Sequence, residues 1–326
     1  MRMKKLPVLL LIILLLLTGF QGTADAVSPS PTPGLQAESS ILSLGGDLFL
    51  ISRQHRISKA YEPEDLVKPA VKTRKDSLQE RIMLRKTAAR ALERMFQAAY
   101  YEKGYTLYAA SGYRSYGIQQ ILFNSKVEEV GSREAAERRV APAGTSEHQL
   151  GLAMDVQAPS QLNLNTDFGS TEEGKWVSQN AHRFGFILRY KEEWRDITGY
   201  SEEPWHIRYV GIAHAAAIYE LNIPLETYTD LALRLPEYVL TGASHVLLIG
   251  LIRDMMEGRE PEELGALIKA VNGDHDAVLR AATAPYLQDG MSYEQALWYA
   301  YPTPRPTSAP RVDLDEETRL SPEKGG

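Results

Sequence analysis

Residues 145 to 156 read T-S-E-H-Q-L-G-L-A-M-D-V, and they hold the densest group of reactive side chains in the sequence. His148 is followed seven positions later by Asp155, which lies in an otherwise apolar run. An ionised acid is costly to bury without a partner, so an aspartate in an apolar strand usually faces a cation or hydrogen-bond donors. The glycine beside Leu150 indicates a loop that carries His148 and then turns into a strand that carries Asp155.

A second motif, E-P-W-H-I-R-Y-V, begins at Glu203 and places Glu203 and His206 at Glu-x-x-His spacing, with His206 fifty-one residues after Asp155. Catalytic zinc commonly takes three nitrogen or oxygen ligands from the protein and keeps a fourth position for water. His148, Asp155 and His206 are ligands of that kind. The two motifs therefore predict a Zn2+ site, with Glu203 near the water as a candidate general base.

Each of these residues also has an ordinary explanation when it is taken alone. A single histidine is more often packed or on the surface than a ligand, an aspartate can belong to a turn or a cap, and Glu-x-x-His spacing arises by chance. The combined pattern favours the metal site. His182 and His214 fall in predicted helices outside these motifs, and we expect both to be structural.

Four motifs in one order carry a resemblance to a known family. They are S-G-Y-R-S-Y-x-x-Q from Ser111, S-x-H-x-x-G-x-A-x-D from Ser146, N-A-H-R-F-G-F-I-L-R-Y from Asn180, and E-P-W-H-x-R-Y-V from Glu203. Together they resemble the VanY-type D-alanyl-D-alanine carboxypeptidases, which are zinc peptidases of a group that includes lysostaphin-like and Hedgehog-like folds. The resemblance covers roughly residues 46 to 229.

The resemblance implies a fold, a substrate and further site residues. The fold is α+β, with a small antiparallel sheet that carries the zinc site and helices packed on its outer face. The substrate is the peptidoglycan stem peptide, cut before its terminal D-alanine. Arg114, Gln119 and Ser146 match positions at the substrate. Without the resemblance, Arg114 would be explained as a surface arginine; with it, Arg114 either holds the substrate carboxylate or stabilises the developing oxyanion.

Other functions fit the same motifs. An L,D-carboxypeptidase that acts on tetrapeptide stems would have the same residues, and a peptidoglycan endopeptidase would need a cleft open at both ends. A non-catalytic wall-binding module would be indicated by the loss of a ligand or of Glu203, and neither is lost. Catalysis is therefore the favoured interpretation.

Composition and the N-terminal residues indicate the partners and the location of the protein. The chain has 326 residues, no cysteine and a net charge of -6, which argues against nucleic acid as a partner. Residues 1–26 have a basic start, an apolar core and small residues at 24–26, so we expect a signal peptide, or else an uncleaved N-terminal anchor. Residues 27–45 are a Pro/Ser-rich linker. These features predict an exported protein that associates with the membrane or cell wall.

The rest of the sequence predicts the strands and helices of an α+β domain and of a helical appendage. Strands are expected at 48–52, 105–110, 185–190 and 205–210, with helices at 77–104, 116–130, 132–139, 171–184, 211–221 and 224–235 and a polar loop at 191–202. Residues 230–301 form a small all-helical C-terminal appendage of unknown function, with helices at 238–258, 261–271, 275–283 and 292–301. A disordered tail is expected at 302–326. The zinc domain itself is assigned to residues 46–229.

Overall fold

The computed structural model describes residues 41–73, 82–243 and 245–259. The predicted signal segment, the linker up to residue 40, the three last predicted helices and the predicted tail lie outside the described residues. Among the residues that are described, no helix combines the length and apolarity that a bilayer span requires.

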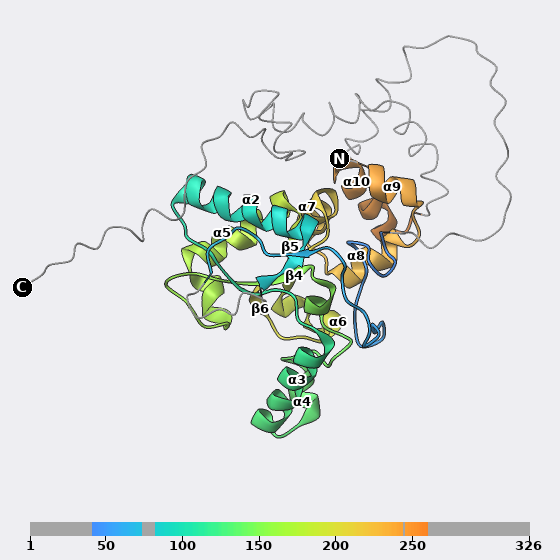
Figure 1. Cartoon of the computed structure of the whole chain (residues 1–326). Coiled ribbons are helices and arrows are strands. Elements are labelled where there is room, and N and C mark those ends of the chain that lie inside the picture. The colour runs from blue at the N-terminus through green and yellow to red at the C-terminus, as the bar shows by residue number, and fades with distance from the viewer. Residues whose placement is uncertain (1–40, 74–81, 244, 260–326) are drawn as a thin grey trace, which may run out of the picture.

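A four-stranded antiparallel sheet forms the centre of the fold, in the order β3-β4-β6-β5 (Figure 1). Its strands are β3 (Tyr108–Ser111), β4 (Ala153–Gln157), β5 (Phe186–Tyr190) and β6 (Glu203–Tyr209). Every residue of β4 is buried, as expected for a central strand covered on both faces. The sheet with its surrounding helices confirms the predicted α+β class.

The register of the sheet brings the two sequence motifs together. In the antiparallel pair of β4 and β6, Asp155 lies directly opposite His206, and Ala153 lies opposite Arg208. On the other side of β4, Asp155 is the partner of Ser111 at the end of β3. A slip of one residue would turn Asp155 to the other face of the sheet, so this register decides whether a site can form.

The helix predicted from Ser77 begins later than expected. Leu84–Arg85 forms strand β2, which pairs with β1 (Leu66–Val67), and helix α2 then runs over Lys86–Lys103. The early start was wrong for the described residues because β1 offers Leu84 and Arg85 a strand partner. The predicted end is confirmed: Gly104 terminates α2 with a φ of 72°.

The strand predicted at 48–52 is also wrong. This segment is irregular, although Leu48 and Ile51 are buried in it. The carbonyl oxygens of Asp47 and Phe49 accept hydrogen bonds from Arg208 Nη2, at 2.9 and 3.1 Å. A side chain from β6 therefore provides donors that a neighbouring strand would otherwise supply.

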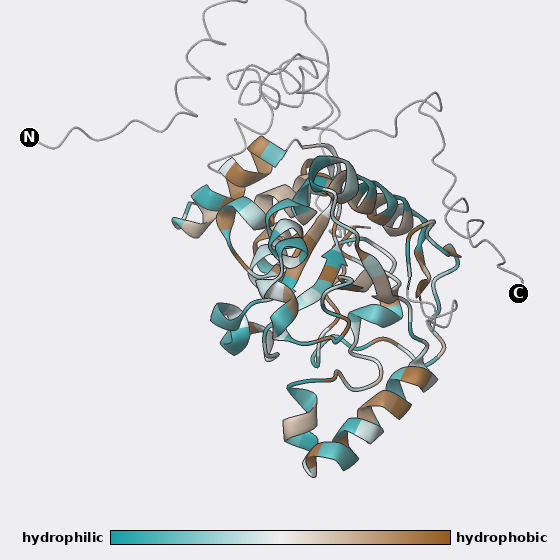
Figure 2. Cartoon of the chain, turned by 90° about the vertical axis from the view of Figure 1, so that its left-hand side faces the viewer, coloured by the Kyte–Doolittle hydropathy of each residue, from teal (hydrophilic) through white to brown (hydrophobic). Residues whose placement is uncertain are grey.

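Helices α3 (Tyr116–Val130) and α4 (Arg133–Glu137) match the prediction and project from the sheet (Figures 1 and 2). The hydroxyl groups of Ser115 and Ser132 cap the first turns by accepting a backbone N–H three residues on. Figure 2 shows apolar residues on this projecting pair, in agreement with the 63% exposure of Ile121.

Short helices make up most of the connections. The predicted helix at 171–184 divides into α5 (Glu172–Asn180) and the 3-10 turn η4 (Ala181–Phe184). The predicted polar loop at 191–202 contains two short helical turns. The other short elements are η2 (Glu147–Leu150), η3 (Thr166–Ser170), η5 (Glu192–Trp194) and α6 (Arg195–Thr198).

The C-terminal helices in the described residues pack on the sheet domain. They are α7 (Ile212–Leu221), α8 (Leu225–Ala232), α9 (Glu237–Gly242) and α10 (His245–Met256), so the single helix predicted at 238–258 is two helices. Leu248, Leu251 and Ile252 of α10 share one buried cluster with residues of α7 and of the sheet. The domain boundary between residues 229 and 230 stays a prediction, and this cluster extends across it.

The packing of α10 predicts a measurable contribution to stability. Leu251 is fully buried, so Leu251→Ala should lower the free energy of unfolding by about 2–5 kcal/mol, because it removes apolar contacts and leaves a cavity. Met256 on the same helix is 49% exposed, and Met256→Ala should change the free energy by less than about 0.5 kcal/mol. Urea unfolding of the full chain measures both. Equal stability of the two variants would show that α10 does not support the domain.

Candidate active site

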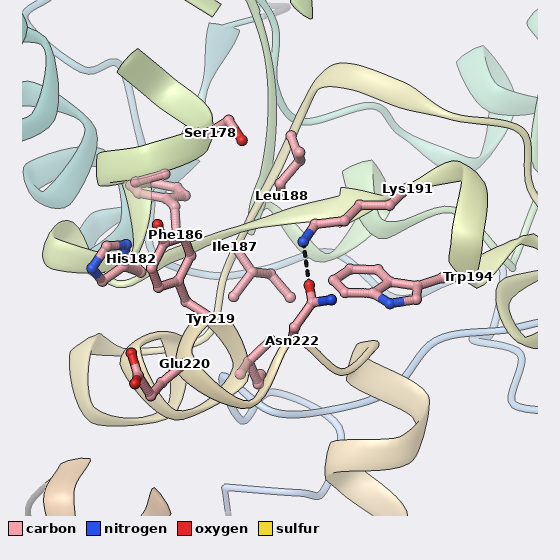
Figure 3. Close-up of a pocket in the computed structure, with 12 residues that line it drawn as sticks. Ser178, His182, Phe186, Ile187, Leu188, Lys191, Trp194, Tyr219, Glu220 and Asn222 are labelled. Atoms are coloured by element: carbon pink, nitrogen blue, oxygen red, sulfur yellow. Dashed lines mark hydrogen bonds between the residues drawn. The ribbon is translucent and has the colours of Figure 1, made fainter. Parts of the chain in front are cut away.

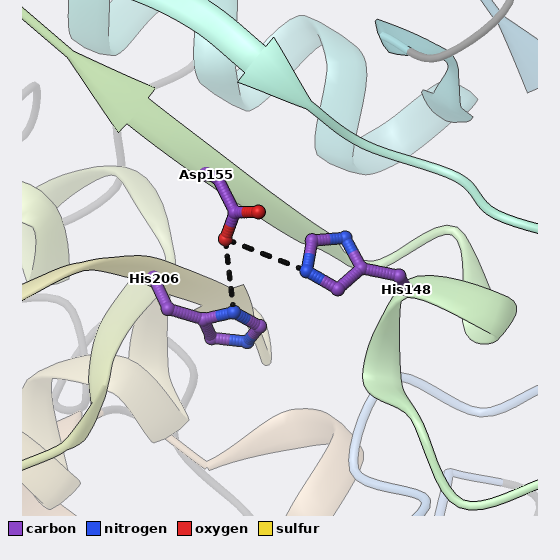
Figure 4. Close-up of side chains that lie close together, drawn as sticks. All are labelled: His148, Asp155 and His206. Atoms are coloured by element: carbon purple, nitrogen blue, oxygen red, sulfur yellow. Dashed lines mark hydrogen bonds and ion pairs between the residues drawn. The ribbon is translucent and has the colours of Figure 1, made fainter. Parts of the chain in front are cut away.

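His148, Asp155 and His206 meet at the centre of the sheet, where their ligand atoms all lie within 4.8 Å of one another (Figure 4). Asp155 Oδ1 is 3.4 Å from His148 Nε2 and 3.1 Å from His206 Nδ1. Each of the three residues is 3% exposed. The structure thus brings together the three side chains that the sequence predicted as metal ligands.

Local geometry explains how His148 reaches Asp155. The 3-10 turn η2 carries His148 and ends at Gly151, whose φ of 66° favours glycine. A Cβ at Gly151 would lie 2.8 Å from Leu66 Cδ2, which a movement of that side chain could relieve, so the positive φ is the main reason for glycine here. The chain then enters β4 and reaches Asp155, as the sequence predicted.

The hydrogen bonding of His148 leaves one ring nitrogen available for a metal. Its Nδ1 lies 2.7 Å from the carbonyl oxygen of Gly112, which can only accept, so Nδ1 carries the hydrogen and Nε2 the lone pair. Burial and the nearby charge of Arg114 lower the pKa of His148 to about 4, so the ring is neutral at pH 7. Gly112 is needed at this point, because a Cβ there would lie 2.5 Å from the Met83 carbonyl oxygen.

The donor set fits zinc. Ligand atoms about 2.0–2.1 Å from one zinc ion at tetrahedral angles lie about 3.3–3.5 Å apart. The distances of 3.4 and 3.1 Å from Asp155 Oδ1 to the two imidazole nitrogens are close to that value. Two histidines and one carboxylate leave a fourth position for water, as in catalytic zinc sites.

Glu203 lies at the edge of this cluster. Its Oε2 is 3.7 Å from His206 Nδ1, and its side chain is 16% exposed, more than any of the three clustered residues. Burial raises the pKa of Glu203 to about 7, and the charge of Asp155 acts in the same direction. A carboxylate at this place can accept a proton from a water molecule beside the cluster.

Arg114 is closer to the candidate ligands than the sequence suggested. Its Nη2 donates to Asp155 Oδ2 at 3.0 Å, its Nη1 to Gln119 Oε1 at 3.1 Å and its Nε to Ser111 Oγ at 3.1 Å. Asp155 thus has Oδ2 bonded to Arg114 while Oδ1 faces the histidines. A guanidinium has five N–H groups, so two remain beyond these three contacts.

Gln119 and Ser146 are brought to the same region. Gln119 is fully buried, and its Nε2 donates to the carbonyl oxygen of Ala141 at 2.7 Å, which ties α3 to the loop before η2. Ser146 is 4% exposed and is the residue directly before η2. Their predicted contacts with substrate stay predictions.

Four charged residues beside the cluster were not identified from the sequence. Glu147 Oε1 accepts hydrogen bonds from Arg189 Nε at 2.8 Å and Arg208 Nη1 at 3.0 Å. Arg189 also forms a two-pronged pair with Glu226. Arg189 and Arg208 lie in the apolar strands F-I-L-R-Y and W-H-I-R-Y, and the rule that a buried charge needs a partner could have found them.

The comparisons with known proteins agree with these motifs. The family model described as VanY, D-alanyl-D-alanine carboxypeptidase, matches residues 81–212. A D-alanyl-D-alanine carboxypeptidase of Enterococcus faecalis (strain ATCC 700802 / V583) is 36% identical over 217 residues, which are 64% of this chain and 75% of the relative. The chain belongs to the VanY D-alanyl-D-alanine carboxypeptidase family.

Solved structures related to this VanY family member include two peptidases. The LdcB LD-carboxypeptidase is 43% identical and aligns over 62% of this chain and 92% of its own, with a TM-score of 0.53. A vancomycin-resistance D,D-pentapeptidase VanY in complex with Zn(II) is 36% identical over 56% of this chain and 98% of its own, with a TM-score of 0.47.

A cavity of about 420 Å³ lies elsewhere on this VanY family member, along strand β5, and shares no residue with the cluster (Figure 3). Lys191 points into it, donates to Asn222 Oδ1 at 2.6 Å and lies 4.3 Å from the centre of the Trp194 ring. His182 stacks on Tyr219 at its edge, with ring centres 3.8 Å apart. These contacts agree with the structural role expected for His182.

His214, the other histidine expected to be structural, lies in α7. Its Nδ1 is 2.7 Å from the hydroxyl oxygen of Tyr228, and the residue is 4% exposed. Burial lowers the pKa of His214 to about 4. Its side chain is therefore part of the packing between α7 and α8.

The cluster predicts the metal content of the purified protein. The wild type should contain about one zinc per chain, and His148→Ala and His206→Ala should each lose it, because two protein ligands do not hold the ion as three do. The exposed histidine His55 lies outside the cluster, and His55→Ala should keep zinc. Elemental analysis measures all four proteins. Full zinc occupancy in the His148 and His206 variants would show that the ligands are other residues.

Proposed function

We propose that the chain is a zinc-dependent carboxypeptidase that removes the C-terminal D-alanine from peptidoglycan stem peptides. The observation that carries this proposal is the cluster of His148, Asp155 and His206 with the Glu203 carboxylate at its edge. Membership of the VanY D-alanyl-D-alanine carboxypeptidase family supports the substrate class.

The site residues have different roles in the proposed peptide hydrolysis. A zinc ion held by the three ligands would supply Lewis acidity and lower the pKa of a water molecule at its open position. Glu203 would accept the proton of that water as it attacks the scissile carbonyl, and would then deliver a proton to the leaving amine. Arg114 would keep Asp155 oriented through Oδ2 and offer its remaining N–H groups to the substrate.

An L,D-carboxypeptidase is the second candidate function. The observation that favours it is the likeness to the LdcB LD-carboxypeptidase, at 43% identity and a TM-score of 0.53. Incubating the protein with tri-, tetra- and pentapeptide stems and analysing the products by mass spectrometry separates the two. The D,D-enzyme shortens the pentapeptide by one alanine, and the L,D-enzyme shortens the tetrapeptide. Release of products from cross-linked peptides alone would indicate an endopeptidase.

An extracytoplasmic location forms part of the proposal. Peptidoglycan lies outside the cytoplasmic membrane, and residues 1–26 have the basic and apolar pattern of an export signal or anchor. Either outcome would bring the enzyme to its substrate, in the cell wall or at the membrane surface.

Glu203→Gln tests the proposed chemistry. The amide keeps nearly the same shape but cannot accept the proton of water, so turnover should fall by about 10²–10⁴-fold while zinc content stays at the wild-type level. The neighbouring residue Glu202 is exposed, and Glu202→Gln should leave turnover unchanged. Steady-state kinetics and elemental analysis measure both. Near-normal turnover in Glu203→Gln would contradict the mechanism, and loss of zinc would make Glu203 a ligand.

Arg114→Lys tests recognition of the substrate carboxylate. Lysine keeps the charge but loses the two-pronged geometry, so KM should rise more than kcat falls. The preference for a free over an amidated substrate C-terminus should shrink by at least about tenfold. Zinc content is measured in parallel, because Arg114 also contacts Asp155. If amidation affects the wild type and the variant equally, Arg114 does not hold the carboxylate.

A further inference from the structure

Glu147 is a buried carboxylate whose orientation is fixed by two arginines. It directly precedes His148 and is 3% exposed. Its Oε1 accepts from Arg189 Nε at 2.8 Å and from Arg208 Nη1 at 3.0 Å. Both guanidinium side chains are 1% exposed or less, so neither can exchange this bond for water. The carboxylate therefore has one oxygen committed to the arginines and the other directed elsewhere.

The two arginines are themselves anchored. Arg189 pairs with both carboxylate oxygens of Glu226 on α8, at 3.0 and 2.6 Å. Arg208 Nη2 donates to the carbonyl oxygens of Asp47 and Phe49. Two carboxylates and two guanidiniums balance in charge, which is the condition under which such a group is tolerated in the interior. We call Glu147, Arg189, Arg208 and Glu226 the arginine clamp.

The second oxygen of Glu147 faces a candidate zinc ligand. Glu147 Oε2 is 3.3 Å from His206 Nε2. Glu147 Oε1 accepts from two guanidinium groups at 2.8 and 3.0 Å, and this pairing favours the ionised carboxylate. An ionised carboxylate can only accept hydrogen bonds, so His206 Nε2 must carry a hydrogen to make this contact.

The contact has a consequence for the opposite side of the ring. A histidine that binds zinc is a neutral imidazole with one N–H, so in the zinc-bound protein a hydrogen on Nε2 leaves the lone pair on Nδ1 for the ion. His206 Nδ1 is the nitrogen that lies 3.1 Å from Asp155 Oδ1, inside the cluster of candidate ligands. The ring also packs against Tyr190, with centroids 5.2 Å apart, which limits other orientations.

We propose that Glu147 is a positioning residue that holds His206 as the Nε2–H tautomer and thereby directs the Nδ1 lone pair at the zinc ion. A carboxylate that accepts the second N–H of a zinc-bound histidine fixes the ring and increases its basicity, and its removal typically costs 10–100-fold in metal affinity. The inference rests on the proposed zinc site. It adds that the arginine clamp connects that site to the 47–49 segment and to α8.

Glu147→Gln is the most informative variant, because the amide keeps the shape of the carboxylate but has one acceptor oxygen instead of two. The amide has one oxygen for three donors. If that oxygen faces the two arginines, the NH2 group faces His206 Nε2 and requires the opposite tautomer, with the hydrogen on Nδ1. If the oxygen faces His206, the NH2 group opposes two buried guanidiniums. The first arrangement should prevail, because hydrogen bonds from the two charged guanidiniums are stronger than one from a neutral imidazole.

Glu226→Gln is the matched control. It removes one carboxylate from the same Arg189 but lies on the far side of that guanidinium from His206. Zinc affinity is measured by competition with a chelator, and the fold of each metal-free variant by circular dichroism. Glu147→Gln should bind zinc about 10–100-fold more weakly than the wild type, while Glu226→Gln should stay within about threefold. Equal losses of zinc affinity in both variants would overturn the proposal, because the charge of the clamp would then explain the loss without the His206 tautomer.

A measurement on the wild type decides the matter even if Glu147→Gln does not fold. In the zinc-loaded protein, ¹⁵N NMR of His206 should show a hydrogen on Nε2 that exchanges slowly with water, and metal coordination at Nδ1. A hydrogen on Nδ1 with coordination through Nε2 would overturn the proposal while leaving the zinc peptidase function intact. Failure of the wild type to bind zinc would instead contradict the proposed function itself.

Discussion

The site depends on the position of Asp155 opposite His206 in the antiparallel pair of β4 and β6. This register places a carboxylate and an imidazole 3.1 Å apart in a largely buried strand pair. Arg114 Nη2 donates to Asp155 Oδ2 at 3.0 Å, and this guanidinium contact favours the ionised carboxylate. Asp155 therefore stays ionised, which is the state that a metal ligand requires.

Three further hydrogen-bonding contacts keep this buried acid and its partners in place. Arg114 occupies Oδ2 of Asp155 from the end of β3, the Gly112 carbonyl holds His148, and Glu147 lies against the far nitrogen of His206. Each of the three candidate ligands thus has a second contact that sets its orientation. Loss of such an outer contact typically costs about 10–100-fold in metal affinity. These contacts orient the three candidate ligands toward one another.

Much of this arrangement could be predicted from the sequence because its signals are local. The alternation of strand and turn around Asp155, the apolar face of α2 and the spacing of Glu203 and His206 all lie within short windows. The strand expected at 48–52 was wrong because an arginine from β6 satisfies its carbonyl groups, which no local pattern reveals. For the arginine clamp, the sequence could have shown that Arg189 and Arg208 need partners, but not which residues those partners are. The residues that pair within the clamp are 37 to 61 positions apart in the sequence, and only the folded chain brings them together.

The central claim is that His148, Asp155 and His206 hold one zinc ion. Anomalous diffraction from crystals of the zinc-loaded protein, collected above and below the zinc absorption edge, tests it most directly. We predict a single strong peak about 2.0–2.2 Å from His148 Nε2, Asp155 Oδ1 and His206 Nδ1. A peak at any other group of residues, or density for water alone between these three atoms, would contradict the account.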